Sequence, residues 1–364
     1  MSSQRILHVI GKMDRAGAET MLMNLYRNID HSQIQFDFVT FTDQKADYDA
    51  EIIELGGRII PILANNPIER MLKLQRFLKN NPEYKIVHAH MLLSNAFHLL
   101  AAKAAGVQHR ISHSHNTSNG HSNKVKKLYE KWALITNRQI ATQKIACSDL
   151  AAYYLFGTTK EVWVLPNAID VNSTMAIANK NHDYIEQNFD CEGLKIIQVG
   201  RLAEVKNHRF SLKIAKELKN RDIEFTMYFI GRGPLDTELK AQVQEELLGN
   251  NIKFLGVRSD ISEIMASADY MIMPSLFEGF GVVLVESQAV GLNAIASNKV
   301  PEQADFNLGL VDFLSLKSVN DWVDCLLQPK QPAPTERQIS YVLGQNGFNV
   351  VDNARKLSEF YTNL

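Results

Sequence analysis

The chain has 364 residues, of which 45% are hydrophobic and 22% charged, a globular composition that is long enough for two domains of about 150–200 residues. Its net charge of −1 argues against a general nucleic-acid-binding protein. The three scattered cysteines, Cys147, Cys191 and Cys325, form no close pair, which argues against a disulfide framework or a zinc cluster and favours a reducing, cytoplasmic compartment. No apolar run reaches the roughly 20 residues that cross a bilayer, and the first residues are predicted to form a strand rather than a signal peptide.

Strands and helices alternate along the first part of the chain, a pattern that predicts a parallel sheet wrapped by helices. The expected strands are 5–10, 36–41, 58–62, 86–89 and 110–114, and the expected helices are 19–26, 49–55 and 68–79. Pro166 and Asn167 then lead into a polar stretch, 172–188, that is predicted to connect two domains.

The second part of the chain follows the same plan. The expected strands are 195–199, 225–230, 252–255, 270–273 and 293–296, with helices at 209–218 and 283–289 and a last helix at 352–361. We therefore predict two doubly wound Rossmann-like domains, 1–170 and 171–345, followed by a C-terminal helical segment, 346–364, that could cross back to the first domain.

Charge divides unevenly between these parts. Residues 1–170 carry a formal charge of +5 and the remainder −6, and nine of the eleven histidines lie in the first part. A basic half suggests an anionic partner, and a random drift of surface charge is an equal alternative.

Ligands of open α/β sheets bind at the carboxyl ends of strands, and the end of strand 195–199 carries two cations. Arg201 and Lys206 follow Gly200 and lie just before a helix, whose N-terminus also attracts anions. The segment therefore predicts a diphosphate clamp, and a solvated basic loop is the alternative.

Two further strand ends have the same character. Gly231-Arg232-Gly233-Pro234 begins like a dinucleotide fingerprint, but Asp236 stands where the third glycine belongs, so a nicotinamide cofactor is disfavoured. The segment 274–281 places Gly279 and Gly281 around Phe280 at a helix start, where free N–H groups could bind a phosphate or a sugar hydroxyl. Glu278 and Glu286 could accept hydrogen bonds from vicinal hydroxyls, or could serve only as charges at the helix start.

Taken together, these segments resemble the retaining GT-B glycosyltransferases of family 4, the glycosyl transferases group 1, of the exopolysaccharide and capsule type. The matching pieces cover nearly the whole chain and are 11–19, 110–116, Cys147-Ser148, 166–170, 200–206, 231–234, 254–256 and 278–286. The resemblance implies two Rossmann-like domains that face each other across a cleft, with the acceptor-binding domain first and the nucleotide-sugar domain second.

The resemblance also implies roles for individual residues. Arg201 and Lys206 match the pair that holds the donor diphosphate and stabilises the departing nucleotide. Glu286 matches the acid that binds the ribose hydroxyls, and Glu278 the acid near the transferred sugar. The remaining donor-binding candidates are the glycine-rich or backbone positions Gly17, Gly231, Gly256, Val257, Gly279, Phe280 and Gly281.

Members of this family use a nucleotide-diphosphate sugar as co-substrate and no bound metal or other cofactor. The one D-x-D, Asp47-Tyr48-Asp49, lies in the first half and is predicted to be a capping and solubility feature. Full activity in EDTA is therefore expected.

The first half supplies the acceptor-side candidates. The loop 11–19 has Ala16-Gly17 where relatives have two glycines, so Gly17 is expected to be its flexible point, and a purely structural turn is the alternative. His113 and His115 are expected to alternate across their strand, so that only one faces the cleft beside the transferred sugar. We favour His115 at the strand tip over His113, and we expect His88 and His90 to be structural.

A basic segment, 124–138, has apolar residues at helical spacing. It could lie on an anionic membrane surface or pack Leu128, Trp132 and Ile135 on the core. The predicted location is the cytoplasm, with the inner face of the membrane as the alternative.

The predicted function is transfer of a sugar from a UDP-hexose or UDP-N-acetylhexosamine to a glycan or polyprenyl-linked acceptor in bacterial polysaccharide synthesis. The alternatives are a nucleotide-sugar epimerase of the same architecture and a catalytically silent partner subunit. The sugar, the acceptor, the linkage and the oligomeric state are not predicted.

Overall fold

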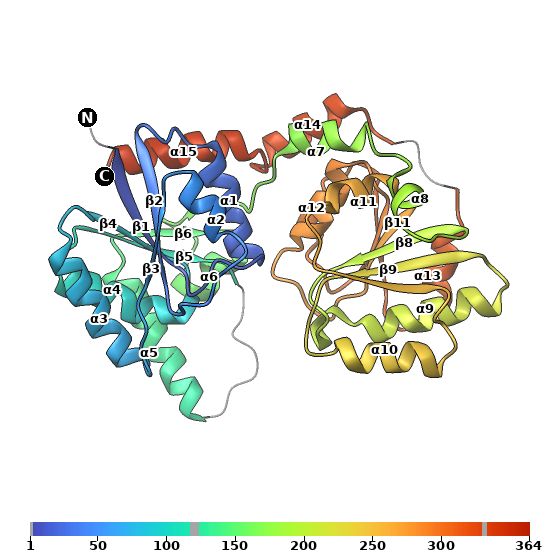
Figure 1. Ribbon diagram of the computed structural model, residues 1–364, viewed down its shortest axis with the longest axis horizontal. Coiled ribbons are helices and arrows are strands. Elements are labelled where there is room, and N and C mark those ends of the chain that lie inside the picture. Colours follow the sequence, from blue (N-terminus) through green and yellow to red (C-terminus); the bar gives the residue numbers. More distant parts are fainter. Residues whose placement is uncertain (1–2, 117–123, 330–332) are drawn as a thin grey trace. The chain divides into compact units, whose positions relative to one another are not determined.

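The computed structural model describes residues 3–116, 124–329 and 333–364, which form two compact units. Unit 1 consists of Met1–Ile169 with Gly347–Leu364, and unit 2 of Asp170–Asn346. Each unit is a parallel sheet with helices on both faces (Figure 1). The predicted fold class, two doubly wound α/β units, is confirmed.

Unit 1 contains a seven-stranded sheet in the order β3-β2-β1-β4-β5-β6-β7. Its strands are β1 (Gln4–Val9), β2 (Ile34–Thr40), β3 (Arg58–Pro61), β4 (Ile86–Ala89), β5 (His109–Ser114), β6 (Gln143–Ala146) and β7 (Trp163–Val164). Its helices are α1 (Gly17–Asn28), α2 (Asp49–Glu54), α3 (Pro67–Asn80), α4 (Asn95–Ala104), α5 (Lys124–Ile140), α6 (Asp149–Phe156) and α15 (Val350–Thr362), with a 3₁₀ turn η1 (Leu92–Ser94).

Alternation along β1 assigns side chains to the two faces of this sheet. Ile6 belongs to the core beneath α1 and α15, whereas Leu7 and Val9 belong to the core beneath α3 and α4. Helix α15 lies beside α1 (Figure 1) and buries Leu357 and Tyr361 completely in the first of these cores. The C-terminal segment therefore completes unit 1.

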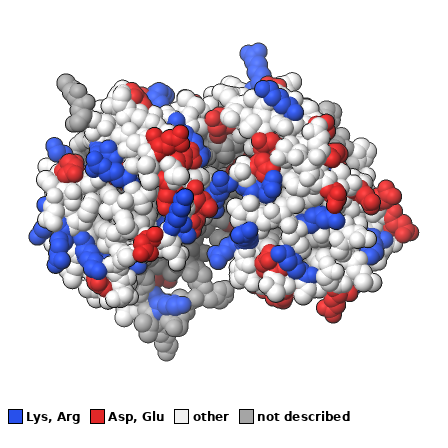
Figure 2. All heavy atoms as spheres, viewed as in Figure 1, with Lys and Arg blue, Asp and Glu red and all other residues white. Residues whose placement is uncertain are grey.

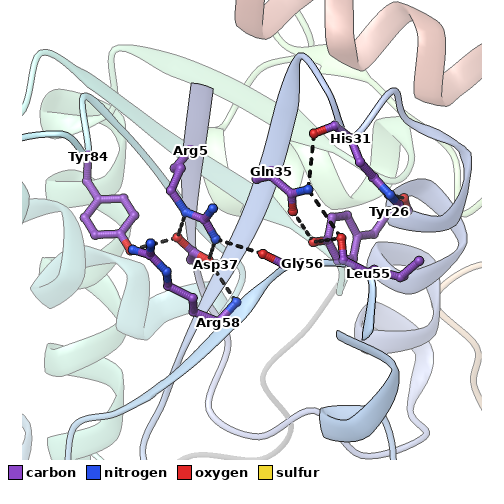
Figure 3. A network of polar contacts seen from close by, with 9 residues as sticks. All are labelled: Arg5, Tyr26, His31, Gln35, Asp37, Leu55, Gly56, Arg58 and Tyr84. Atoms are coloured by element: carbon purple, nitrogen blue, oxygen red, sulfur yellow. Dashed lines mark hydrogen bonds and ion pairs between the residues drawn. The ribbon is translucent and has the colours of Figure 1, made fainter. Parts of the chain in front are cut away.

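A buried carboxylate on the α3 and α4 face of this sheet is surrounded by donors (Figure 3). Asp37 is fully buried in β2 between two phenylalanines, and its oxygens accept from Arg5 Nε at 2.5 Å, from Tyr84 Oη at 2.7 Å and from Arg58 N at 2.8 Å. The ion pair raises the pKa of Arg5, and burial raises the pKa of Tyr84 to about 12. We call Arg5, Asp37, Tyr84 and the Arg58 amide the Asp37 network.

The same end of the sheet holds a second, neutral set of contacts. Tyr26 Oη donates to Gln35 Oε1 at 2.5 Å, and Gln35 Nε2 donates to the carbonyls of His31 and Leu55 (Figure 3). In both sets the donors and acceptors are paired with each other within unit 1. These hydrogen bonds therefore hold the first residues of β2 and β3 in place in the sheet.

Unit 2 contains a six-stranded sheet in the order β10-β9-β8-β11-β12-β13. Its strands are β8 (Leu194–Val199), β9 (Phe225–Ile230), β10 (Ile252–Gly256), β11 (Tyr270–Met273), β12 (Ala294–Ser297) and β13 (Val311–Leu314). Its helices are α7 (Val171–Ala178), α8 (Tyr184–Asn188), α9 (His208–Asn220), α10 (Asp236–Glu245), α11 (Ile261–Ser267), α12 (Val282–Ala289), α13 (Val319–Leu326) and α14 (Glu336–Gln345), with 3₁₀ turns η2 (Glu204–Lys206) and η3 (Glu302–Ala304).

The prediction that 172–188 is a connecting stretch was wrong, because this stretch holds α7 and α8. Asp170 caps α7 by accepting from Ser173 N at 3.0 Å, and Met175 and Ile185 are buried while the polar residues between them face outward. Several short elements were also missed, namely α4, β6, α6, α10, α11, β13, α13 and α14. The loops that follow the strands were placed correctly, and these loops carry the candidate site.

The distribution of surface charge and the apolarity of the helices bear on the partners of the protein. On the face drawn in Figure 2, Lys and Arg are interspersed with Asp and Glu over both units, so the positive charge of the first half is not gathered there into one basic patch. Among the residues that the structure describes, no helix is long and apolar enough to cross a bilayer.

Candidate active site

Glycines bring the first two loops of unit 2 together at the carboxyl ends of β8 and β9. Gly231 has φ +138°, and a Cβ there would lie 2.1 Å from the carbonyl oxygen of Gly200. A Cβ at Gly233 would lie 2.2 Å from the carbonyl oxygen of Leu202. Leu202 N donates to Arg232 O at 3.2 Å across the same contact. Only glycine permits this approach, so the two loops form one backbone platform.

An ion pair joins this platform to the loop after β11. Lys206 Nζ lies 2.6 Å from Glu278 Oε1, and Ser275 Oγ donates to the same oxygen at 2.6 Å. The lysine and glutamate side chains are 20% and 10% exposed. Lys206 and Glu278, which were predicted separately as a diphosphate ligand and as a carboxylate near the sugar, therefore form an ion pair in the structure, and both side chains remain partly accessible to water.

Backbone contacts fix the position of that pair. Leu276 N donates to Val205 O at 2.8 Å, and Asn207 Nδ2 donates to Pro274 O at 3.0 Å. Asn207 adopts a left-handed conformation, φ +55°, between η2 and α9. Sequence reasoning did not single out Ser275 and Asn207, although both stand beside the predicted residues Lys206 and Glu278.

The other two charged candidates have no side-chain partner among the described residues. Arg201 follows β8 and is exposed, and Glu286 is half-buried in the second turn of α12. Burial raises the pKa of Glu286 to about 7. No hydrogen bond or ion pair among the described residues joins the Arg201 or Glu286 side chain to the Lys206–Glu278 pair, so both side chains keep their hydrogen-bonding groups for a ligand.

The remaining candidates of unit 2 line the same edge of the sheet. Gly256 ends β10 with φ +69°, and its carbonyl accepts from Gly231 N at 2.7 Å, while Val257 is 50% exposed. Gly279 and Phe280 are half-buried and lead to Gly281, which precedes α12 with φ +93°. The free N–H groups at the start of α12 complete a set of cations, backbone donors and carboxylates that can hold a phosphorylated sugar.

In unit 1, the glycine-rich loop differs from its prediction in one respect. Gly17 is the first residue of α1, its φ is not positive, and a Cβ there would meet nothing within 4 Å. The position that needs glycine for its backbone is Gly11, with φ +62°.

The two aspartates of the D-x-D motif, Asp47-Tyr48-Asp49, accept hydrogen bonds from backbone amides. Asp47 accepts from Arg15 N at 2.9 Å, and Asp49 accepts from Ala46 N at 2.8 Å.

Five histidines of unit 1 gather on one face of the sheet. The expectation that His113 and His115 alternate across β5 was wrong, because residues two apart share a face, and their ring centroids lie 4.0 Å apart. His88 and His90 lie on the same face, beside His8 of β1. Sequence reasoning missed His8, although its spacing from Ile6 and Ile10 places it on the α1 and α15 face.

Burial keeps these five histidines neutral. It lowers the pKa of His8 and of His115 to about 3, and it lowers the pKa values of His88, His90 and His113 well below the ordinary value. The ring nitrogens form hydrogen bonds mainly with one another. His115 directly follows β5 and is half-buried.

Helix α5 does not pack on the core through the residues predicted to do so. Leu128 is 71%, Trp132 38% and Ile135 43% exposed, whereas Ala133 and Asn137 are fully buried. The exposed apolar residues are accompanied by Lys127 and Lys131, which are also exposed. The core-packing alternative is therefore wrong for Leu128 and Ile135, whereas Trp132 packs against Phe97 of α4 with 4.9 Å between the ring centroids.

Comparisons with known proteins match this arrangement. The family model "Glycosyl transferases group 1" matches residues 180–307, and the model "Glycosyltransferase Family 4" matches residues 15–173. EpsF of Bacillus subtilis, which is assigned as a glycosyltransferase, is 37% identical over 374 residues, covering 99% of this chain and 97% of the relative.

Two further matches are more distant. An Escherichia coli protein named UDP-Gal:alpha-D-GlcNAc-diphosphoundecaprenol alpha-1,3-galactosyltransferase is 24% identical and covers 84% of this chain and 83% of its own length. The crystal structure of Anabaena Alr3699/HepE in complex with UDP-glucose covers 99% of this chain and 100% of its own, with a TM-score of 0.79 and 18% identity. At that identity the second match shows a shared fold.

Proposed function

Since the chain belongs to the glycosyltransferases of group 1 and family 4, we propose that it transfers a hexose or N-acetylhexosamine, with retention of configuration, from its UDP derivative to a polyprenyl-linked or glycan acceptor. The printed name of the Escherichia coli relative gives a UDP-galactose donor and a diphosphoundecaprenol-linked acceptor. HepE has been crystallised with UDP-glucose. The epimerase alternative finds no support in these comparisons.

The observation that carries the donor site is the Lys206–Glu278 pair on the glycine platform. Lys206 Nζ and Glu278 Oε1 are 2.6 Å apart. Because Gly200 and Gly231 have no side chains, the loops after β8 and β9 can approach each other next to Lys206. We assign Lys206 and Arg201 to the diphosphate, Glu278 to hydroxyls of the transferred sugar and Glu286 to the ribose. Gly231, Gly256 and Val257 line the side of the base, and Gly279, Phe280 and Gly281 offer backbone donors.

The chemistry of the step explains why cations are needed there. When the bond between the anomeric carbon and the phosphate oxygen breaks, both electrons leave with the UDP, and the sugar carbon becomes electron-poor. Fixed cations beside the phosphates stabilise this developing charge and lower the barrier. The acceptor hydroxyl then forms the new bond to the sugar carbon and gives its proton to the departing diphosphate, so one glycosidic bond replaces the bond to UDP, and the step needs no metal.

Unit 1 is assigned to the acceptor. We assign His115 to an oxygen of the transferred sugar, with His113 behind it on the same face of the sheet, and Gly17 of the loop 11–19 to the donor. The exposed Leu128, Trp132 and Ile135 of α5, with Lys127 and Lys131, favour contact with an anionic membrane surface, where a polyprenyl-linked acceptor would be found.

A thermal-shift titration in EDTA tests the donor site first. UDP and UDP-sugars should raise the melting temperature, because a ligand that binds only the folded state stabilises it. The shift should be lost in Lys206→Ala and kept in Lys213→Ala, which removes an exposed lysine from α9. Stabilisation by NAD alone, or an unchanged UDP shift in Lys206→Ala, would contradict the assignment.

Transfer itself separates an enzyme from a silent partner subunit. Release of UDP from the stabilising UDP-sugar, measured with a polyprenyl-diphosphate sugar as acceptor and with EDTA present, should depend on Lys206. Binding of the donor without any turnover over a panel of such acceptors would favour the silent-subunit alternative.

Liposome flotation tests the membrane assignment of α5. The protein should float only with liposomes that contain anionic lipid, and the double variant Lys127→Glu, Lys131→Glu should no longer float.

A further inference from the structure

Three imidazoles in unit 1 form a continuous hydrogen-bonded file. His8 Nδ1 lies 2.9 Å from His90 Nε2, and His90 Nδ1 lies 3.0 Å from His115 Nε2. The inner end, His8, is fully buried against Phe36 and Phe38. The outer end is His115, which follows β5. We call His8, His90 and His115 the histidine file.

A second set of bonds runs beside this file without joining it. Tyr361 Oη of α15 lies 2.6 Å from His88 Nδ1, and His88 Nε2 lies 3.2 Å from His113 Nδ1. The rings of the two sets stack, with 4.2 Å between the centroids of His88 and His90, but no hydrogen bond joins the sets in the part of the chain that the structure describes. The second set therefore serves as an internal control for the first.

Neutral imidazoles restrict how such a file can be protonated. Each neutral ring has one N–H donor and one acceptor nitrogen. His90, at the centre, must donate to one neighbour and accept from the other. Only two arrangements satisfy both bonds, and they differ in direction along the whole file, so the tautomers of His8, His90 and His115 are set together.

The unpartnered atoms at the two ends favour one direction. His8 Nε2 and His115 Nδ1 are buried and have no hydrogen-bond partner among the described residues. Each direction leaves one N–H without a partner: His8 Nε2–H if His90 donates to His8, and His115 Nδ1–H if His8 donates to His90. A buried N–H without an acceptor is rare in proteins. His8 is fully buried against Phe36 and Phe38, whereas His115 directly follows β5 and is half-buried, so a ligand could supply the missing acceptor only at the His115 end. In that direction His8 Nδ1–H donates to His90, His90 Nδ1–H donates to His115, and the proton of His115 lies on Nδ1.

We propose that His8 and His90 are positioning residues that hold His115 in the tautomer with the proton on Nδ1, which makes His115 a hydrogen-bond donor to an oxygen of the transferred sugar. This inference rests on the proposed function, in which His115 lies beside that sugar. The ligand group it requires is a hydroxyl, ring or phosphate oxygen that can accept. Without the hydrogen bonds of His8 and His90, His115 would populate both tautomers, and Nδ1 would carry the donor proton in only a fraction of the molecules.

The tautomers can be observed directly by ¹⁵N NMR of the histidine side chains in the full chain. In the wild type, the proton of His115 should lie on Nδ1. In His8→Phe, which removes the inner partner within an aromatic setting, the resonances of His90 and His115 should move toward the other tautomer. His8→Asn returns a polar group near the position of Nδ1 and should restore the wild-type pattern at least in part.

Matched variants separate this effect from general damage. Tyr361→Phe breaks only the second set and should change His88 and His113 while leaving the tautomer of His115 unchanged. His98→Leu removes a buried histidine of α4 that belongs to neither set, and it should leave all five resonances in place. If His8→Phe does not fold, His90→Asn cuts the file at its centre and provides the same comparison.

Turnover provides the functional measurement. With saturating UDP-sugar, kcat should fall about 3- to 10-fold in His8→Phe, the worth of one hydrogen bond, with KM for the donor unchanged and partial recovery in His8→Asn. His98→Leu should keep the wild-type kcat.

Three results would have distinct meanings. A His115 tautomer that does not respond to His8→Phe or His90→Asn overturns the inference. Stoichiometric Zn²⁺ that survives dialysis and moves the His8 and His90 resonances also overturns it, because the rings would then be metal ligands. A tautomer that responds as expected, with full activity in His115→Ala, leaves the coupling intact and refutes only the proposed role of His115.

Discussion

The Asp37 network and the histidine file lie on opposite faces of one sheet, and they differ in what they leave unpaired. Asp37 is charged, fully buried and surrounded by donors from Arg5, Tyr84 and the Arg58 amide. The file is neutral and ends in two nitrogens, His8 Nε2 and His115 Nδ1, that have no partner among the described residues. A polar network that closes on itself serves stability, whereas one with unused hydrogen-bonding capacity is a candidate for ligand binding.

Unit 2 repeats the second kind of arrangement. Lys206 and Glu278 hold each other at 2.6 Å, but Arg201 and Glu286 have no side-chain partner in the described part of the chain. The comparison therefore predicts that substitutions in the Asp37 network reduce folding stability, whereas substitutions in the candidate site of unit 2 reduce ligand binding.

The largest effect is expected from breaking the closed network. Asp37→Ala leaves the Arg5 guanidinium without its buried partner and should lower the free energy of unfolding by about 3–5 kcal/mol. Urea denaturation measures this. Glu51→Ala, which breaks an exposed ion pair with Arg27, should cost no more than about 1 kcal/mol. Equal costs for the two variants would contradict the importance of burial.

The next effect concerns binding rather than folding. Lys206→Ala should weaken UDP binding by about 1.5–3 kcal/mol, the worth of a hydrogen bond to a charged group. Its free energy of unfolding should change little without ligand, because the side chain is still partly exposed. Calorimetric titration with UDP checks this. A variant that unfolds readily but binds UDP normally would reverse the assignment.

Acid sensitivity should distinguish buried histidines from the rest. Burial lowers the pKa of His98 to about 3, so the unfolded chain binds its proton first as the pH falls below about 6.5, and stability is lost from there toward pH 3. Between pH 7.5 and pH 5 this single group should cost about 2 kcal/mol. His98→Leu should remove that share of the pH dependence in urea denaturation. An unchanged slope would show that the ring is protonated in the folded state.

The last prediction concerns Glu286, whose effect on stability has the opposite dependence on pH to that of His98. Because burial raises its pKa to about 7, the ionised carboxylate is unfavourable in the folded state, and stability is lost as the pH rises through that value. Glu286→Gln should therefore raise the melting temperature at pH 8 and leave it unchanged at pH 4, while weakening UDP binding. A melting temperature that falls at pH 8 would indicate a structural role for the ionised group.

The sequence predicted the fold class and the loops that carry chemistry, because glycines and charges at strand ends are local signals. Gly200, Lys206 and Glu278 were identified in this way. It did not predict that 172–188 is helical, since the apolar positions Met175 and Ile185 are sparse among polar residues and gain their burial from the packing of α7 and α8 on α11, and of α7 also on α12 and α14. Tertiary packing, rather than local pattern, decides such short helices.

The histidine face shows the same limit. The spacing of His113 and His115 was available in the sequence, but we expected the rings to lie on opposite faces, although the period of two in a strand places them together. That His8 completes the file depends on β1 pairing with β4, with His8 opposite His88, a register between residues far apart in the chain. The order of strands in a sheet cannot be derived from the local pattern of any one strand.

Helix α15 has a consequence for the order in which the chain folds. Unit 1 is completed by Val350, Leu357 and Tyr361, but all of Asp170–Asn346 is translated between its two parts. At 5–20 residues per second, the sheet of unit 1 waits on the order of ten seconds or more on the ribosome with its α15 groove uncovered. Unit 2 can fold before α15 has been synthesised. Until then the nascent chain exposes the apolar groove that α15 later covers, and chaperones and unit 2 itself would compete to bind this groove.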